Sequence, residues 1–141
     1  GGTVGSLEPK LTVSGGIVST AGITPDTRYP WGQCTWWAAT RRADIGKPIP
    51  GWGNAATWAG SAASAGYTVD GSPSAGSVIV FQPGVLGASA GYGHVAMVEE
   101  VRGDGSILTS ESNVLGLGVV STREISASQL AAAGSGVRYI H

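Results

Sequence analysis

The chain has 141 residues, which suits a single domain able to bury its own core. Charged residues make up only 12% of it and the net charge is −1, so it lacks the clustered Lys and Arg that nucleic acid requires, and we expect no nucleic-acid partner. Hydrophobic residues make up 42% of the chain, which excludes a wholly disordered protein, and no apolar run is long enough for membrane insertion. A single cysteine excludes an internal disulfide and Cys-based zinc or iron–sulfur clusters.

The first 25 residues are rich in Gly, Ser and Thr and contain two short β-like runs, at residues 11–13 and 16–19. We expect residues 1–25 to form a linker or a loosely attached edge segment and residues 26–141 to form the folded catalytic domain. Such a segment indicates a piece of a larger multidomain protein, and we expect this domain to be monomeric within it. The low charge and many small residues favour a secreted or cell-surface location.

Two helices follow this segment. After a turn at residues 30–32, residues 33–45 predict a helix that ends at Gly46. A second helix is expected over residues 54–65, with Asn54 as its N-cap. We expect Arg41 and Arg42 to lie on a solvated helix face.

The rest of the chain predicts strands and one short helix, near residues 128–133. The strands are expected at residues 77–81, 94–101, 106–113, 118–124 and 137–140. Helices followed by a meander of strands predict an α+β fold, with the N-terminal helices packed on an antiparallel sheet of about five to six strands.

Cys34 falls in the first turn of the first predicted helix. Free backbone N–H groups and the helix dipole stabilise an anion there, which lowers the pKa of a thiol. The same N–H groups suit the oxyanion of an attacked carbonyl, so Cys34 is a candidate nucleophile. The alternative is that Cys34 is a small buried hydrophobic residue.

A nucleophilic thiol needs a base, and His94 opens a predicted strand. The sequence Arg102-Gly-Asp-Gly105 predicts a two-residue hairpin loop, which puts Glu111 and Asn113 on the same face as His94. Either residue would orient the imidazole and stabilise its protonated form. A loop with an odd number of residues would turn Glu111 away. The alternative is a structural histidine beside solvated polar residues.

Together these residues resemble the CHAP family, the cysteine- and histidine-dependent amidohydrolases/peptidases of the papain-like, NlpC/P60-related group. The resemblance runs from about Tyr29 to Asn113. Its blocks are Gly32-Gln-Cys-Thr-Trp-Trp-Ala38, Gly53-Asn-Ala-Ala-Thr-Trp58, Ser74-Ala-Gly-Ser-Val-Ile-Val80, and Gly93-His-Val-Ala-Met-Val-Glu99 followed by Ser110-Glu-Ser-Asn113.

The resemblance implies a papain-like fold and a role for each motif residue. Cys34 would be the nucleophile, His94 the general base, and Glu111 or Asn113 the orienting residue. Gln33 would contribute to the oxyanion hole with the N–H of Cys34. Aromatic residues on loops near the site are candidates for the substrate groove, namely Tyr29, Trp31, Trp52 and Tyr92.

The family's usual substrate is bacterial peptidoglycan, so the resemblance implies a peptidoglycan hydrolase of the cell wall, either an N-acetylmuramoyl-L-alanine amidase or a stem or cross-bridge endopeptidase. Some members bind calcium through acidic residues upstream of the cysteine. Only Asp26 stands there, so we predict no metal site and no cofactor. The alternatives are a catalytically silent wall-binding or adaptor domain on the same scaffold, and a cytosolic cysteine peptidase or acyltransferase.

Overall fold

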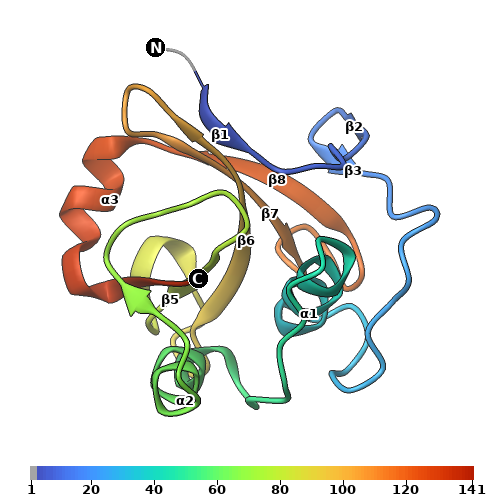
Figure 1. Ribbon diagram of the computed structural model, residues 1–141, viewed down its shortest axis with the longest axis horizontal. Coiled ribbons are helices and arrows are strands. Elements are labelled where there is room, and N and C mark those ends of the chain that lie inside the picture. The colour runs from blue at the N-terminus through green and yellow to red at the C-terminus, as the bar shows by residue number, and fades with distance from the viewer. Residues whose placement is uncertain (1–2) are drawn as a thin grey trace.

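The computed structural model describes residues 3–141, and over these residues the chain forms an α+β fold with three α-helices on one antiparallel sheet (Figure 1). The predicted fold class is confirmed. The predicted number of strands is wrong, because the described part of the sheet has nine strands. The extra strands are only two to four residues long. Two of them overlap the β-like runs at residues 11–13 and 16–19, and the other two, at residues 3–6 and 69–70, are too short for a hydrophobic pattern to reveal.

The strands pair in the order β2-β3-β8-β7-β6-β5-β9-β4, and β1 pairs with β6 outside this path. Their bounds are β1 Thr3–Ser6, β2 Val13–Ser14, β3 Ile17–Val18, β4 Val69–Asp70, β5 Val78–Phe81, β6 His94–Arg102, β7 Ile107–Ser112, β8 Val120–Ile125 and β9 Val137–Ile140. The helices are α1 Cys34–Asp44, α2 Trp58–Ser64, which follows a 3-10 turn at Ala55–Thr57, and α3 Ala127–Ala133. All five predicted strands are present with boundaries shifted by a few residues.

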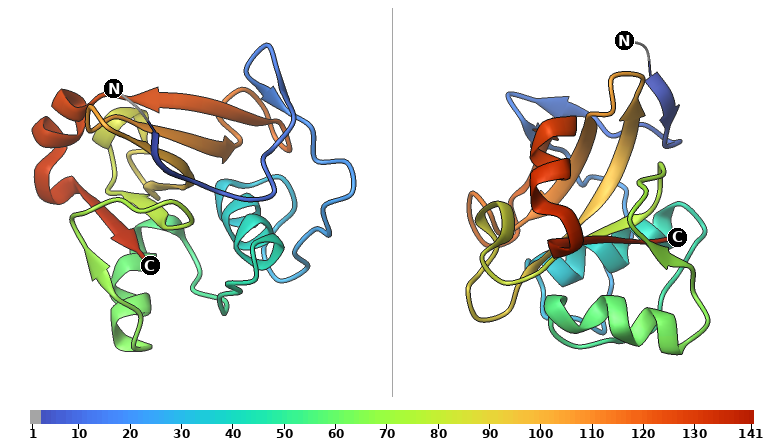
Figure 2. Two further views of the ribbon diagram at one scale, coloured as in Figure 1. Left: turned by 45° about the horizontal axis from the view of Figure 1, so that its top comes forward. Right: turned by 90° about the vertical axis from the view of Figure 1, so that its left-hand side faces the viewer.

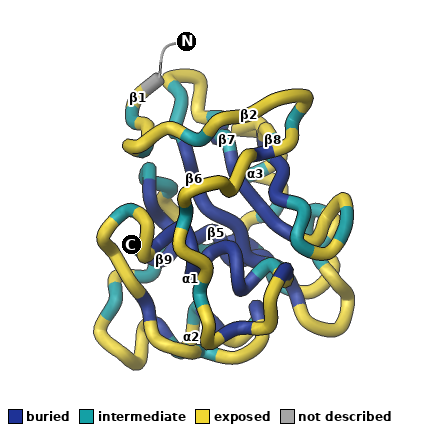
Figure 3. Tube along the Cα trace, turned by 90° about the vertical axis from the view of Figure 1, so that its right-hand side faces the viewer, coloured by how far each residue is buried: buried dark blue, intermediate teal, exposed yellow. Residues whose placement is uncertain are grey.

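Apolar side chains cover both faces of the central strands. The four residues of β5 are all buried, and they alternate between two clusters, as strand geometry requires. One cluster joins the sheet to α1 and α2, and the other packs under α3. Figure 2 shows the helices packed around the strands, and in Figure 3 the central strands carry the colour of buried residues.

Helix α1 lies where the sequence predicts it. Gln33 is its N-cap, Ile45 its C-cap, and Gly46 adopts the positive φ of 78° that ends many helices. The solvated face expected at Arg41 and Arg42 is wrong, since these side chains are 0% and 2% exposed. Both guanidinium groups find partners inside: Arg41 binds the buried carboxylate of Glu99 at 2.9 Å, and Arg42 donates to backbone carbonyls.

The β6–β7 hairpin differs from the prediction in two compensating ways. Its loop is the odd-numbered Gly103-Asp-Gly105, closed by a 2.9 Å bond from the Arg102 N–H to the Ser106 carbonyl. That loop alone would turn Glu111 away from His94. However, β6 has a bulge at Glu99, between the pairs Val98↔Thr109 and Glu100↔Leu108. The extra residue shifts the register by one and returns Glu111 to the His94 face.

The N-terminal segment contributes three short strands to the sheet. β1 pairs with β6, and the β2–β3 hairpin pairs with β8. Leu7 donates to the carbonyl of Glu99, the bulge residue, and Val18 is buried. Within the described residues, no helix is both long enough and apolar enough to cross a membrane.

Candidate active site

The candidate nucleophile and base come from the ends of two elements. Cys34 is the first residue of α1, and His94 is the first residue of β6. The fold therefore holds a thiol at a helix N-terminus beside an imidazole at a strand end. Both side chains are partly accessible: Cys34 is of intermediate exposure, and the His94 side chain is 12% exposed.

Glu111 fixes the orientation of the His94 ring. Its Oε1 lies 2.9 Å from Nε2 of His94, and the Glu111 side chain is only 2% exposed. Because Nε2 faces the carboxylate, Nδ1 is the ring nitrogen left for the thiol of Cys34. The three residues thus form a chain of thiol, imidazole and buried carboxylate.

The electrostatics of these three side chains favour a thiolate–imidazolium pair. Burial alone would raise the pKa of Cys34, but hydrogen bonding with His94 and its charge, together with the Val95 and Thr35 N–H groups, lower it overall. Burial alone would lower the pKa of His94, but hydrogen bonds with Cys34 and Glu111 and their negative charges raise it to about 9. Both shifts favour the state in which the proton is on His94 and the sulfur is ionised.

A fourth charged residue, Arg123 of β8, completes the cluster. Its Nη2 donates to the same Oε1 of Glu111 at 3.0 Å, and its Nη1 donates to the Leu86 carbonyl at 2.7 Å. Its guanidinium lies 5.1 Å from the centroid of the Phe81 ring, whose centroid is 5.5 Å from that of His94. Arg123 was not predicted from the sequence. The side of the sheet on which its side chain lies depends on the register between β7 and β8, and the Gly-rich connection between these strands does not reveal that register.

Asn113 lies beside Gln33. Its Nδ2 donates to Oε1 of Gln33 at 3.1 Å, and its backbone adopts a positive φ of 66°. Of the two residues considered for orienting the imidazole, Glu111 makes the contact with His94. With its Oε1 held by Asn113, Gln33 has its amide NH₂ left to donate elsewhere, next to Cys34.

The turn before Cys34 is packed closely on the β7–β8 connection. The Gly32 carbonyl accepts from Ser112 Oγ at 2.8 Å and from the Gly118 N–H at 3.0 Å. Gly32 has a φ of 83°, and a Cβ there would lie 2.7 Å from the Gly118 nitrogen. Only glycine fits this position, which places the backbone of the nucleophile turn against the loop that contains Asn113.

A groove of about 460 Å³ opens beside the thiol, and the residues that line it include Gln33, Cys34 and Thr35. Of the four aromatic candidates, Tyr29 and Tyr92 line this groove. Trp52 packs edge-on against Trp58 and Tyr67, at ring-centroid distances of 5.6 and 5.1 Å. Trp31 is 61% exposed and stacks at 5.9 Å on Trp36, outside the set of lining residues.

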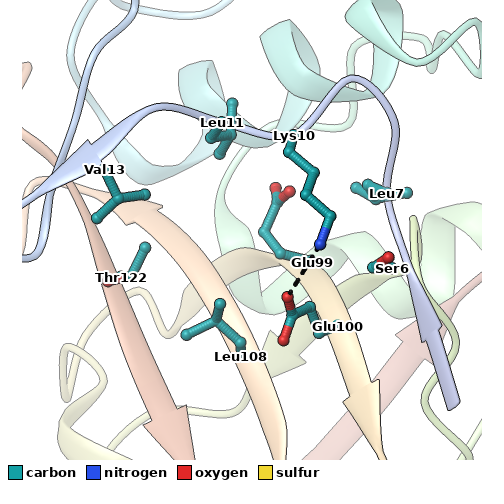
Figure 4. A pocket seen from close by; sticks show the side chains of 9 residues that line it. All are labelled: Ser6, Leu7, Lys10, Leu11, Val13, Glu99, Glu100, Leu108 and Thr122. Carbon is teal, nitrogen blue, oxygen red and sulfur yellow. Dashed lines mark ion pairs between the residues drawn. The ribbon is translucent and has the colours of Figure 1, made fainter. Parts of the chain in front are cut away.

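A second hollow, of about 170 Å³, lies between the N-terminal segment and the sheet (Figure 4). The described residues that line it include no cysteine or histidine, and its Lys10 faces Glu100 at 4.0 Å. Its other carboxylate, Glu99, is already neutralised by Arg41. This hollow therefore offers no nucleophile. Over residues 3–141, no group of three or more Cys, His, Asp or Glu side chains is arranged to hold a metal ion.

The model of the CHAP domain family matches residues 24–113, which include every residue of the thiol–imidazole–carboxylate chain. Three curated relatives come from Staphylococcus aureus. An N-acetylmuramoyl-L-alanine amidase domain-containing protein is 45% identical, over 74% of this chain and 17% of the relative. The probable autolysin SsaALP is 46% identical, over 80% and 40%. N-acetylmuramoyl-L-alanine amidase sle1 is 39% identical, over 94% and 41%.

Solved structures agree with these matches. The crystal structure of an N-acetylmuramoyl-L-alanine amidase from Staphylococcus aureus superposes with a TM-score of 0.75 at 41% identity, covering 82% of this chain and 31% of that one. The structure of Ly7917 superposes with a TM-score of 0.52 at 26% identity, covering 77% of this chain and 52% of that one. The chain thus spans less than half the length of the three curated relatives.

Proposed function

The chain belongs to the CHAP domain family, and from this we propose that it is a cysteine amidohydrolase that cleaves an amide bond of bacterial peptidoglycan. The observation that supports this most is the Cys34–His94–Glu111 chain beside an open groove. The similar proteins named as amidases and as a probable autolysin point to the cell wall as its place of action. We further infer that the domain works within a longer, secreted or surface-attached protein.

In the first step, the Cys34 thiolate attacks the amide carbonyl carbon. The carbonyl oxygen becomes an oxyanion, which the Cys34 N–H and the Gln33 side-chain amide stabilise; one such donor contributes about 3–4 kcal/mol to lowering the barrier. The imidazolium of His94 then gives its proton to the leaving nitrogen. The C–N bond breaks, an amine departs, and a thioester on Cys34 remains.

In the second step, neutral His94 removes a proton from a water molecule, which attacks the thioester. The same oxyanion donors act again, the C–S bond breaks, and the carboxylic acid product leaves. Glu111 keeps the imidazole oriented and stabilises its protonated form in both steps. An N-acetylmuramoyl-L-alanine amidase and a stem or cross-bridge endopeptidase would share this chemistry and differ only in the amide presented.

The alternative is a catalytically silent wall-binding domain on the same scaffold. Alkylation of Cys34 distinguishes the two. We expect iodoacetamide to modify wild-type Cys34 near pH 6 far faster than a model thiol, because His94 keeps the sulfur ionised. His94→Ala should remove this excess, whereas Glu124→Gln, an exposed carboxylate on the same sheet, should retain it. Slow alkylation in all three proteins would favour the silent domain.

A further inference from the structure

We infer that Arg123 is a positioning residue of this active site, which holds the Glu111 carboxylate on His94 and balances its charge. This inference rests on the proposed function, since it assigns a role within the same catalytic chain. Arg123 touches neither the thiol nor the groove. It acts on His94 through Glu111 and Phe81.

The contacts of Glu111 show why a second partner is needed. Its Oε1 receives both described side-chain hydrogen bonds of this carboxylate, from His94 Nε2 at 2.9 Å and from Arg123 Nη2 at 3.0 Å. With His94 as its only partner, the position of this carboxylate would be fixed by a single hydrogen bond. Arg123 supplies a second hydrogen bond and a permanent positive charge, which hold the Glu111 carboxylate in place against His94.

The other contacts of Arg123 fix where that charge sits. Nη1 donates to the Leu86 carbonyl at 2.7 Å, in the connection between β5 and β6, while the central guanidinium carbon lies over the Phe81 ring. Phe81 pairs with His94 in the sheet register, and their rings are adjacent. A planar guanidinium can bind both oxygens and stack on the ring at once, which a lysine ammonium cannot do.

The result is a row of four groups with alternating charge. Cys34 of α1 faces His94 of β6, which faces Glu111 of β7, which faces Arg123 of β8. With the thiolate and imidazolium formed, the row has no net charge. Removing Arg123 would leave a net negative charge in a largely buried site, and proton uptake by Cys34 and His94 would then become more favourable.

The test measures the pH dependence of Cys34 alkylation by iodoacetamide in wild type, Arg123→Gln, Arg123→Lys and the control Arg102→Gln. Arg102 forms ion pairs with Glu100 and Glu124 at the far end of β6, where both carboxylates are more exposed than Glu111. In Arg123→Gln, we expect the acid limb of the curve of alkylation rate against pH to move to higher pH by about one unit, because a cation near the thiolate has been lost. Arg123→Lys should keep the limb near its wild-type position and lose severalfold in plateau rate, and Arg102→Gln should match wild type.

Identical limbs in wild type and Arg123→Gln would overturn the inference. If Arg123→Gln does not fold, Arg123→Lys still decides, since an unchanged plateau rate in that variant would also overturn it. Alkylation requires no peptidoglycan. If the limb shifts as expected in Arg123→Gln but the wild-type protein does not cut intact cell walls, the proposed substrate is contradicted and the role of Arg123 is still supported.

Discussion

At the scale of single residues, one buried carboxylate decides how the imidazole behaves. Glu111 is 1% exposed and shares one oxygen between His94 and Arg123. The positions of Cys34 at a helix start and of His94 at a strand start could be predicted from the sequence, because both are local features. Arg123 could not, because its contact with Glu111 depends on pairing across β7 and β8.

Glu111→Gln should move the alkaline limb of activity to lower pH. The wild-type imidazolium persists until the pH rises through about 9, and above that His94 can no longer protonate the leaving group. Without the carboxylate the pKa of His94 falls, so the limb should move down by about one to two pH units, with a loss of roughly 10²–10⁴-fold in kcat. A pH–rate profile on cell walls measures this, with Glu124→Gln as the control. An alkaline limb that stays at the wild-type pH in Glu111→Gln would show that Glu111 does not influence proton transfer by His94.

Asn113→Gly should slow hydrolysis without changing the alkylation of Cys34. Glycine accepts the positive φ of 66° at this position, so the backbone is preserved while the bond to Gln33 is lost. A misoriented Gln33 amide should cost roughly 10- to 100-fold in kcat, because it no longer faces the oxyanion. Alkylation forms no oxyanion and serves as the internal control. An equal loss in both assays would instead implicate the thiolate itself.

At the scale of elements, the nucleophile helix and the strand of the base are joined by a buried ion pair. Arg41 of α1 binds both carboxylate oxygens of Glu99, at 3.1 and 2.9 Å, and Glu99 is the bulge residue that sets the register of Glu111. Helix α1 was predictable from its end signals. The bulge could not be predicted, because it depends on the contact of Glu99 with its tertiary partner Arg41. The predicted two-residue loop of the hairpin was also wrong.

Arg41→Met should destabilise the fold strongly, because it leaves the Glu99 carboxylate buried without its partner. We expect a loss of about 3–5 kcal/mol in the free energy of unfolding. Arg41→Met combined with Glu99→Met should recover part of that loss, since no unpaired charge remains. Urea unfolding measures both. Arg102→Met, which breaks the exposed pair with Glu124, should cost under about 1 kcal/mol. A similar small loss for Arg41→Met would show that the buried pair does not stabilise the helix on the sheet.

At the scale of the whole molecule, the segment over residues 3–18 is tied to the sheet near the bulge. Leu7 donates to the Glu99 carbonyl, and Arg41 donates to the Pro9 carbonyl at 2.8 Å. The other end of the chain is also held: Nε2 of His141 lies 2.7 Å from Oδ1 of Asp70, and its Nδ1 lies 2.6 Å from Oγ of Ser74. Such long-range contacts stabilise strands that are too short to be stable by themselves.

We propose that residues 26–141 form the catalytic unit. Removing residues 1–25 should lower the free energy of unfolding by about 2–5 kcal/mol, through lost hydrogen bonds and exposure of apolar surface near Val18. It should leave the pH limbs of Cys34 alkylation in place, because the segment does not touch His94 or Glu111 through any described hydrogen bond. Thermal unfolding and alkylation of the shortened chain test this. A shortened chain that folds and yet loses the excess reactivity of Cys34 would disprove the boundary.

The most direct measurement is digestion of purified peptidoglycan followed by mass spectrometry of the soluble fragments. The wild-type protein should release fragments with a new carboxyl group and a new amine at one amide position, and the position identifies the bond that is cut. Cys34→Ala and His94→Ala should release none above the level of untreated walls. Equal release by the wild-type protein and Cys34→Ala would contradict the thiol mechanism.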